Sequence, residues 1–569
     1  MKTLLRYVKW LYRNSKGVRW ALVANTLMGL LSVTLNLIFI WINKRLVDIA
    51  TGDFTSSKGI FSGLTERLNL ALSQSGHGTL GRVLGIFAVI LIVLMLLRLL
   101  MNAYNTRLSN ITYAKMNFLI RQRLFSNLLQ AQWQGKEKMH TGDTLNRLFS
   151  DVNTVTSVIC NDIPSLVTTS FQFLAAAGFL AMMDWRLALI LVLITPLFVL
   201  LGRIFFRKMR RMTSEIRKTE GQIQSHIQET LQHKTTVQSL DRSEMMEDQL
   251  DDLQSEEYGQ IMRRTRFSIL SSTIVRATFS FSYTAVFLWC VFGIYKGTIT
   301  FGMMTAFLQL VSQVQNPTRG LARVVGGLVN ASASMDRLME LEDVQKEEQG
   351  EPMALTGIAG IRIEHLTFAY PDSDTNIYED FSFDFPPGSR TAIVGETGAG
   401  KSTLIRLMLS LLRPTVGRII LYDKEKEVEA GARTRVNLVY VPQGNTLFSG
   451  TIRDNLLMGD PDASEEALWA ALDTAAAGFV KDLPEGLDTP CGERGAGLSE
   501  GQAQRIAIAR GLLRPGSILL MDEFSSSLDP QTEALLMQNL TERGGDKTMI
   551  FITHREKIAE YCDHILRIG

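Results

Sequence analysis

Long apolar runs occupy the first 330 residues of the chain and are absent from the remainder. The first run lies between Trp20 and Trp41, where twenty mostly apolar residues would form about 30 Å of helix, enough to span a bilayer. The two tryptophans stand where interfacial anchors are common. Because the run is long enough to span a bilayer, we interpret it as a first transmembrane helix and not as a signal peptide.

Five further runs predict a bundle of six membrane-spanning helices. They cover approximately Leu80–Leu100, Ile163–Met183, Arg186–Arg203, Ser268–Tyr295 and Phe301–Arg319. The polar stretch Gly52–Thr79 is expected to be an external loop. The turn Asp184–Trp185 would join the third and fourth spans, and Lys296–Thr300 the fifth and sixth.

Both internal connections are about sixty residues long and keep a helical pattern rich in charge. They run from Met101 to Asn161 and from Arg203 to Arg266. Structureless loops of that length are uncommon, so we expect helical hairpins that extend from the membrane. The segments Trp133–Thr141 and His233–Asp241, near the tips, are the candidate contact segments.

The N-terminus carries lysines and arginines but no acidic residue before the first span. Such a start could be an organelle transit peptide. The positive-inside rule explains the same charges more simply and predicts a cytoplasmic N-terminus. We therefore expect a multi-pass protein of the cell (cytoplasmic) membrane.

Few polar residues lie within the spans, and such residues usually face a bundle interior or a wet cavity. They are Asn25, Asn36, Arg276, Tyr283, Gln309 and Gln313. Gln309 and Gln313 share one helical face, which suits the lining of a substrate path. Hydrogen bonding between helices is an equally good explanation.

The pattern changes after the sixth span. Residues 1–341 are expected to form the all-α transmembrane domain, residues 342–357 an acidic linker, and residues 358–569 an α/β domain with a parallel core sheet. The strand-like segments are Ile361–Tyr370, Phe381–Phe385, Thr391–Val394, Ile419–Tyr422, Leu438–Val441, Ile518–Asp522 and Thr548–Thr553.

A glycine-rich loop between one of these strands and a helix matches the phosphate-binding pattern G-x-x-x-x-G-K-[ST] in full. Its residues are Gly395, Glu396, Thr397, Gly398, Ala399, Gly400, Lys401, Ser402 and Thr403. The loop amides and the helix N-terminus would hold phosphates. Lys401 would reach the β- and γ-phosphates, and Ser402 would ligate Mg²⁺. The sequence therefore predicts a P-loop NTPase domain.

Three strand ends carry residues that phosphoryl transfer needs. Asp522 would hold Mg²⁺ and Glu523 would orient or deprotonate a water. Gln443 would ligate the metal or its water, and His554 would contact the γ-phosphate or hold the water.

A second serine- and glycine-rich helix start follows at Leu498–Gln502. With one P-loop already present, this second anion site would serve another nucleotide. Two chains facing head to tail would then give each ATP both halves, which predicts a two-fold symmetric dimer.

Overall charge and cysteine content add only exclusions. The net charge of +2 says nothing about an acidic partner, and we expect no nucleic acid. The four cysteines show no C-x-x-C pairing, which argues against a disulfide framework and a zinc site.

Taken together, the chain resembles an ABC transporter half-subunit of the exporter type over nearly all its length. The resemblance makes Gly395–Ser402 the Walker A motif, Gln443 the Q-loop glutamine and Leu498–Gln502 the signature. The remaining matches are Walker B with Asp522 and Glu523, the switch histidine His554, the adenine-stacking Tyr370, the D-loop Ser526–Asp529 and the X-loop Gly492–Gly495.

The family implies that Ser499, Gly501, Gln502 and Asp529 also bind nucleotide. It further implies that the hairpin tips are coupling helices, and that ATP closes the dimer and hydrolysis reopens it.

Three residues depart from the family pattern: Glu500 replaces a glycine, and Phe524 and Ser527 replace the commoner alanines. No catalytic group is lost, so we expect a homodimeric, ATP-hydrolysing exporter or flippase whose lipid, peptide or small-molecule substrate the sequence does not name. The alternatives are the competent half of a heterodimer with a related half-transporter and, from another class, an ATP-gated channel or sensor.

Overall fold

The computed structural model describes residues 2–51, 77–132, 141–370, 373, 375–492, 497–544 and 546–569. The chain divides into two compact units. The first, here the helical unit, comprises Met1–Phe125 and Thr144–Glu342, and the second, the sheet unit, comprises Ser126–Asp143 and Asp343–Gly569. The expected external loop and the first contact segment fall almost wholly outside the described residues, as does most of the expected X-loop.

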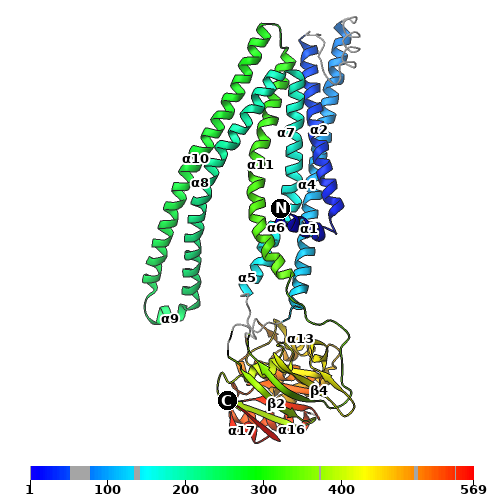
Figure 1. Ribbon diagram of the computed structural model, residues 1–569, viewed down its shortest axis with the longest axis vertical. Coiled ribbons are helices and arrows are strands. Elements are labelled where there is room, and N and C mark those ends of the chain that lie inside the picture. Colours follow the sequence, from blue (N-terminus) through cyan, green and yellow to red (C-terminus); the bar gives the residue numbers. More distant parts are fainter. Residues whose placement is uncertain are drawn as a thin grey trace. The chain divides into compact units, whose positions relative to one another are not determined.

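The helical unit contains the six long segments that the apolar runs predict (Figure 1). Its α-helices are α1 Lys2–Asn14, α2 Arg19–Ala50, α4 His77–Leu129, α5 Thr141–Asn146, α6 Val152–Ser157, α7 Ile163–Met183, α8 Trp185–Gln232, α9 Lys234–Ser239, α10 Ser243–Tyr295 and α11 Phe301–Glu342. The six expected spans lie on α2, α4, α7, α8, α10 and α11. In the described part of the chain, four helical segments are long and apolar enough to cross a membrane: α2, α4, α10 and the continuous stretch Gly142–Met183.

Both long internal connections are helical, as expected. Helices α8 and α10, of 48 and 53 residues, run side by side and are joined by the short helix α9 (Figure 1). Asp184 alone separates α7 from α8, so the expected two-residue turn is one residue too long. The Asp184 carboxylate accepts hydrogen bonds from the amides of Arg186 and Leu187 and thereby caps α8.

Polar side chains within the spans pair between helices. Arg98 on α4 donates to the Asn36 side-chain oxygen on α2 at 2.6 Å, and Gln172 on α7 donates to Gln313 on α11. Gln313, one of the two expected lining residues, therefore makes an interhelical hydrogen bond.

A buried ion pair near the end of α2 lies against the start of α11. Lys44 lies 2.8 Å from the Asp48 carboxylate, and both side chains are buried. The other Asp48 oxygen accepts from the Thr300 hydroxyl at 2.6 Å and the Gly302 amide at 3.1 Å. Asp48 thus caps α11 from another helix, and a Cβ on Gly302 would lie only 2.2 Å from it.

The sheet unit holds two main sheets. The parallel sheet has the order β11-β3-β10-β9-β6, and the antiparallel sheet has the order β2-β1-β4-β5. The strands of the parallel sheet are β3 Arg390–Gly395, β6 Leu438–Val441, β9 Ile518–Asp522, β10 Thr548–Ile552 and β11 His564–Ile568. Those of the antiparallel sheet are β1 Gly360–Phe368, β2 Tyr378–Phe385, β4 Val416–Tyr422 and β5 Glu427–Glu429.

Helices and a small third sheet complete the unit. The α-helices are α12 Lys401–Met408, α13 Ile452–Leu457, α14 Glu465–Thr474, α15 Glu500–Leu513, α16 Pro530–Arg543 and α17 Glu556–Ala559, and β7 Gly450–Thr451 pairs with β8 Pro490–Cys491. Every residue of β9 and β10 is buried, as the unbroken apolar runs predict for central parallel strands.

Residues 345–347 are tied to the residues that follow α4 and, through Arg435, to α12 within the sheet unit. Main-chain hydrogen bonds of 2.8 and 2.9 Å join Gln132 to Gln345 and Glu347 to Gln130. The Glu347 carboxylate pairs at 2.6 Å with both terminal nitrogens of Arg435. The same guanidinium donates to the carbonyls of Leu409 and Ser410, and so caps the C-terminal end of α12.

The buried pair at Asp48 gives a stability prediction for the helical unit. Replacing Asp48→Asn keeps an oxygen for Thr300 and Gly302 but leaves the Lys44 ammonium without its counter-charge. We expect a loss of about 3 kcal/mol, the usual cost of breaking a buried pair. The measurement is thermal unfolding of the purified protein in detergent.

The matched control is the exposed pair Arg211–Glu215 on α8. Glu215→Gln should change stability by less than about 0.5 kcal/mol, because solvent already screens that pair. Equal melting temperatures for wild type and Asp48→Asn would contradict the role given to the buried pair.

Candidate active site

The glycine-rich loop connects β3 to α12 and has the backbone that phosphate binding requires. Gly398 and Gly400 adopt φ angles of +94° and +96°, which L side chains rarely adopt. A Cβ on Gly400 would also lie 2.6 Å from Ile377. The Tyr378 hydroxyl donates to the Gly400 carbonyl at 3.0 Å and fixes the last turn of the loop.

Lys401 lies folded into this loop. Its ammonium donates to the carbonyls of Gly395 and Glu396 at 2.9 and 2.7 Å, and the residue is 5% exposed. The loop therefore gathers one cation and the free amides of a helix N-terminus in one place. That combination attracts a phosphate.

Asp522, at the end of β9, is buried beside this loop. Burial raises the pKa of its carboxyl, although a hydrogen bond from Ser402 and the charge of Lys401 oppose the shift. The buried Asp522 Oδ1 has no hydrogen-bond partner in the described part of the chain. An unpartnered carboxylate oxygen beside a hydroxyl fits a divalent cation with oxygen ligands.

The next residue, Glu523, is the point on which two other strand ends converge. The Gln443 amide donates to one carboxylate oxygen at 2.6 Å, and His554 Nε2 lies 2.7 Å from the other. Glu523 itself has a φ of +44°, a strained backbone for a residue with a side chain. Its amide donates to the Ile552 carbonyl at 3.0 Å, which anchors it to β10.

Tyr370 lies against the helix that follows the loop. Its hydroxyl is 3.2 Å from the Thr403 hydroxyl and accepts from Arg406 at 3.4 Å. Its ring packs edge-on against Phe368. The aromatic residue expected to stack on adenine thus lies near the P-loop helix.

The signature residues form a separate group at the start of α15. Ser499 and Gln502 make a capping box, in which the Ser499 oxygen accepts the Gln502 amide at 3.2 Å and Gln502 Oε1 accepts the Ser499 amide at 2.9 Å. Glu500 is exposed. In the described residues, no hydrogen bond joins this group to the P-loop.

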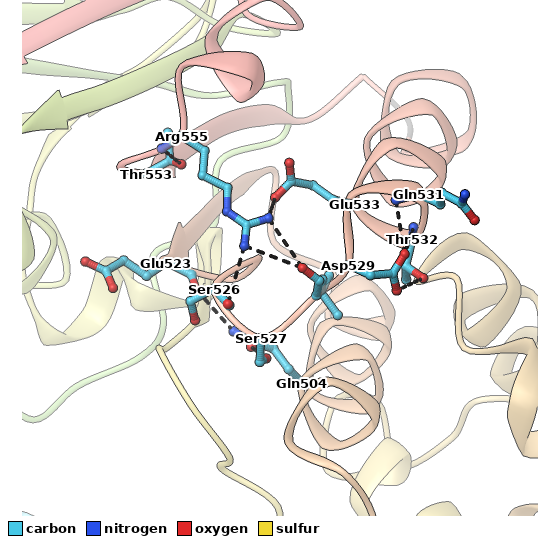
Figure 2. Close-up of polar contacts among 11 residues, drawn as sticks. Gln504, Glu523, Ser526, Ser527, Asp529, Gln531, Thr532, Glu533, Thr553 and Arg555 are labelled. Atoms are coloured by element: carbon cyan, nitrogen blue, oxygen red, sulfur yellow. Dashed lines mark hydrogen bonds and ion pairs between the residues drawn. The ribbon is translucent and has the colours of Figure 1, made fainter.

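Asp529, the last expected nucleotide-binding residue, is the N-cap of α16 (Figure 2). Its carboxylate accepts from the amides of Gln531 and Thr532, both at 3.0 Å, and from the Thr532 hydroxyl at 2.6 Å. This hydrogen bonding ends the D-loop and starts the helix.

Two residues that the sequence analysis did not single out hold the D-loop on either side (Figure 2). Arg555, directly after His554, pairs with Glu533 at 2.5 Å and lies 3.4 Å from the Leu528 carbonyl. On the other side, Gln504 of α15 accepts from the Ser527 hydroxyl at 2.7 Å. Gln504 is one of several polar residues on α15, so the sequence alone carried no signal that singled it out.

Family models match both units. The model described as "ABC transporter transmembrane region" matches residues 22–318, and the model described as "ABC transporter" matches residues 378–526. The chain belongs to the ABC transporter family. It is a half-transporter, with one membrane region and one ATP-binding domain, and it is a multi-pass membrane protein that binds ATP.

Individual relatives agree with this assignment. The chain is 30% identical to an ATP-dependent lipid A-core flippase of Pseudomonas fluorescens over 79% of this chain and 74% of the relative. It is 28% identical to a β-(1→2)glucan export ATP-binding/permease protein of Brucella suis over 76% and 72%. A solved bacterial Atm1-family ABC exporter with ATP bound shares the fold, with a TM-score of 0.78, 23% identity and coverage of 97% and 94%. The chain is accordingly an ATP-driven exporter or flippase with an unidentified substrate.

The loop geometry predicts a specific effect of a small substitution on ATP binding. Gly400→Ala should weaken binding by roughly tenfold, because the added methyl meets Ile377 and the φ of +96° is strained for alanine. Titration of the purified protein with a fluorescent ATP analogue measures the change.

Gly478→Ala is the control, since Gly478 is exposed and a Cβ there meets no described atom within 4 Å. Unaltered affinity in Gly400→Ala, with normal affinity in the control, would show that the loop tolerates a side chain at this position.

Proposed function

We propose that this half-transporter hydrolyses ATP, with Glu523 as the residue that polarises the attacking water. The observation that carries the proposal is the convergence of Gln443 and His554 on the two Glu523 oxygens, at 2.6 and 2.7 Å. A base must be oriented before it is useful, and two fixed neighbours orient this one. A carboxylate held in this way can take a proton from water that attacks a phosphate.

The P-loop residues Gly395–Thr403 hold the phosphates in this proposal. Lys401 pairs with the β- and γ-phosphates, exchanging its loop carbonyl partners for phosphate oxygens. Tyr370 stacks on the adenine. His554 holds the water or the γ-phosphate, and Gln443 orients Glu523 or the water at the metal.

Ser402, Asp522 and Gln443 would hold Mg²⁺, which neutralises charge on the phosphates when bound. The unpartnered Asp522 Oδ1 and the nearby Ser402 hydroxyl support this assignment. The buried Asp522 carboxyl, whose pKa is raised, would be stabilised in its charged form by a cation.

The functional unit in this proposal is a dimer of two copies of the chain. One chain holds a P-loop group and a separate signature group, Ser499, Gly501 and Gln502 with Asp529 of the D-loop. Head-to-tail pairing would bring the signature group of each chain to the nucleotide of the other, in a closed two-fold arrangement. A heterodimer with a related half-transporter is the alternative arrangement.

The domain boundaries and the orientation complete the proposal. Residues 1–341 form the transmembrane domain, residues 342–357 the linker and residues 358–569 the nucleotide-binding domain. The N-terminus and the ATP-binding domain lie in the cytoplasm, because the basic N-terminus precedes the first span and six crossings return the chain to the same side. The membrane is the cytoplasmic membrane.

The role of Glu523 is tested by Glu523→Gln, which keeps the shape of the side chain and removes its basicity. ATP turnover should fall by at least about a hundredfold, the usual contribution of a general base, while ATP binding is retained. Turnover is measured as phosphate release in nanodiscs, and binding with a fluorescent ATP analogue.

Glu542→Gln on the exposed face of α16 is the matched control and should turn over at the wild-type rate. Wild-type turnover in Glu523→Gln would remove Glu523 from the mechanism. Ion currents without substrate-stimulated hydrolysis would instead favour a channel.

The dimer is tested by purifying the chain alone and measuring its mass in detergent. We expect a stable dimer with ATPase activity, because each chain carries both halves of a nucleotide site. A monomer that hydrolyses ATP only after addition of a different half-transporter would favour the heterodimer.

A further inference from the structure

Gln504 belongs to the signature helix and faces the strand end that carries Glu523. It lies on α15, which begins at the signature, and it is completely buried. Its Oε1 accepts from the Ser527 hydroxyl at 2.7 Å, and its Nε2 lies 3.5 Å from the Glu523 carbonyl oxygen. Figure 2 shows Gln504, Ser527 and Glu523 drawn together at the D-loop.

The Ser527 hydroxyl decides which way the Gln504 amide points. A side-chain amide has an oxygen that accepts and a nitrogen that donates. Because Ser527 donates to the oxygen, the nitrogen must face the other way, toward Glu523. An alanine at position 527 would remove this constraint and leave a buried amide oxygen without its partner.

The backbone at Glu523 needs such support. Its φ of +44° is strained, and strained residues persist where the surroundings hold them in place. The Glu523 carbonyl also accepts from the Ser526 amide at 3.2 Å, in the first turn of the D-loop. Gln504 therefore acts on the same carbonyl oxygen that fixes the start of the D-loop.

The signature helix and the D-loop also touch directly. A Cβ on Gly501 would lie 2.8 Å from the Ser527 carbonyl, so the first turn of α15 packs on the D-loop backbone. On the far side of the loop, Arg555 holds Glu533 and approaches the Leu528 carbonyl. The D-loop is thus held between α15 and the segment that carries His554.

We propose that Gln504 and Ser527 are positioning residues that keep the Glu523 carboxylate aligned for hydrolysis and link it to the signature helix. The inference rests on the proposed role of Glu523. Neither residue touches the nucleotide; they act by fixing the Glu523 backbone and the turn that follows it. A shift of α15 on nucleotide binding would reach Glu523 through this amide.

The test is Ser527→Ala in the full-length protein in nanodiscs. We expect kcat for ATP to fall roughly fivefold, because the Gln504 amide loses the partner that orients it, with KM and ATP affinity unchanged. Ser527→Thr, which keeps the hydroxyl, should restore kcat. Glu542→Gln, on the exposed face of α16, should match the wild type.

Amide hydrogen exchange of the peptide that spans residues 520–530 is the second readout and does not require turnover. Exchange at the Ser526 amide should be faster in Ser527→Ala than in the wild type or Ser527→Thr. Ser527→Cys fills the same space with a much weaker donor and should exchange as fast as Ser527→Ala, whereas a hydroxyl that merely fills space predicts slow exchange in the cysteine variant.

The outcomes separate this inference from the proposed function. If the wild type hydrolyses ATP and Ser527→Ala has the same kcat, KM and amide exchange as the wild type, the positioning role is overturned. The proposed ATP hydrolysis then still stands. If the wild type itself does not hydrolyse ATP, the proposed function fails, and unchanged exchange in Ser527→Ala then overturns the Gln504–Ser527 link as well. Faster exchange in Ser527→Ala, reversed by threonine, supports the link in either case.

Discussion

The candidate active site depends on the common edge at which parallel strands end. Strands β3, β6, β9 and β10 run in the same direction, so the residues that follow them meet at one edge of the sheet. This constraint brings together Gly395, Gln443, Glu523 and His554, although 159 positions of chain (554 − 395) separate the first from the last. No local sequence signal could place these groups together; only the parallel pairing does.

Much of the site could be predicted from the sequence because its elements are strongly patterned. The runs Leu438–Val441 and Ile518–Asp522 match β6 and β9 residue for residue; Pro442 limits the first, because it cannot donate to a strand ladder, and the acidic pair Asp522–Glu523 limits the second. The glycine spacing likewise predicted the P-loop, because few residues other than glycine adopt its φ angles. Local chemistry is enough in both cases.

The parts that could not be predicted depend on contacts between distant residues. Gln504 is one polar residue on a helix, and only the packing of α15 against the D-loop gives it Ser527 as a partner. The antiparallel sheet is a second case, since its strands β1 and β4 were predicted but their pairing was not. In the helical unit, the long loops were correctly expected to be helical, but the capping of α11 by Asp48 comes from a helix 252 positions earlier in the chain.

The hydrogen bonds that join residues 345–347 to the residues after α4 have a mechanical consequence. Gln130 and Gln132 are joined to residues 345–347 through the main chain, and Glu347 reaches the carbonyl end of α12 through one arginine. A charge-assisted, bidentate ion pair is stronger and better defined in geometry than a hydrogen bond between neutral side chains. The residues that directly follow α4 and the helix that carries Lys401 are therefore both held, within the sheet unit, by residues 345–347, so a displacement of one strains the hydrogen bonds that hold the other.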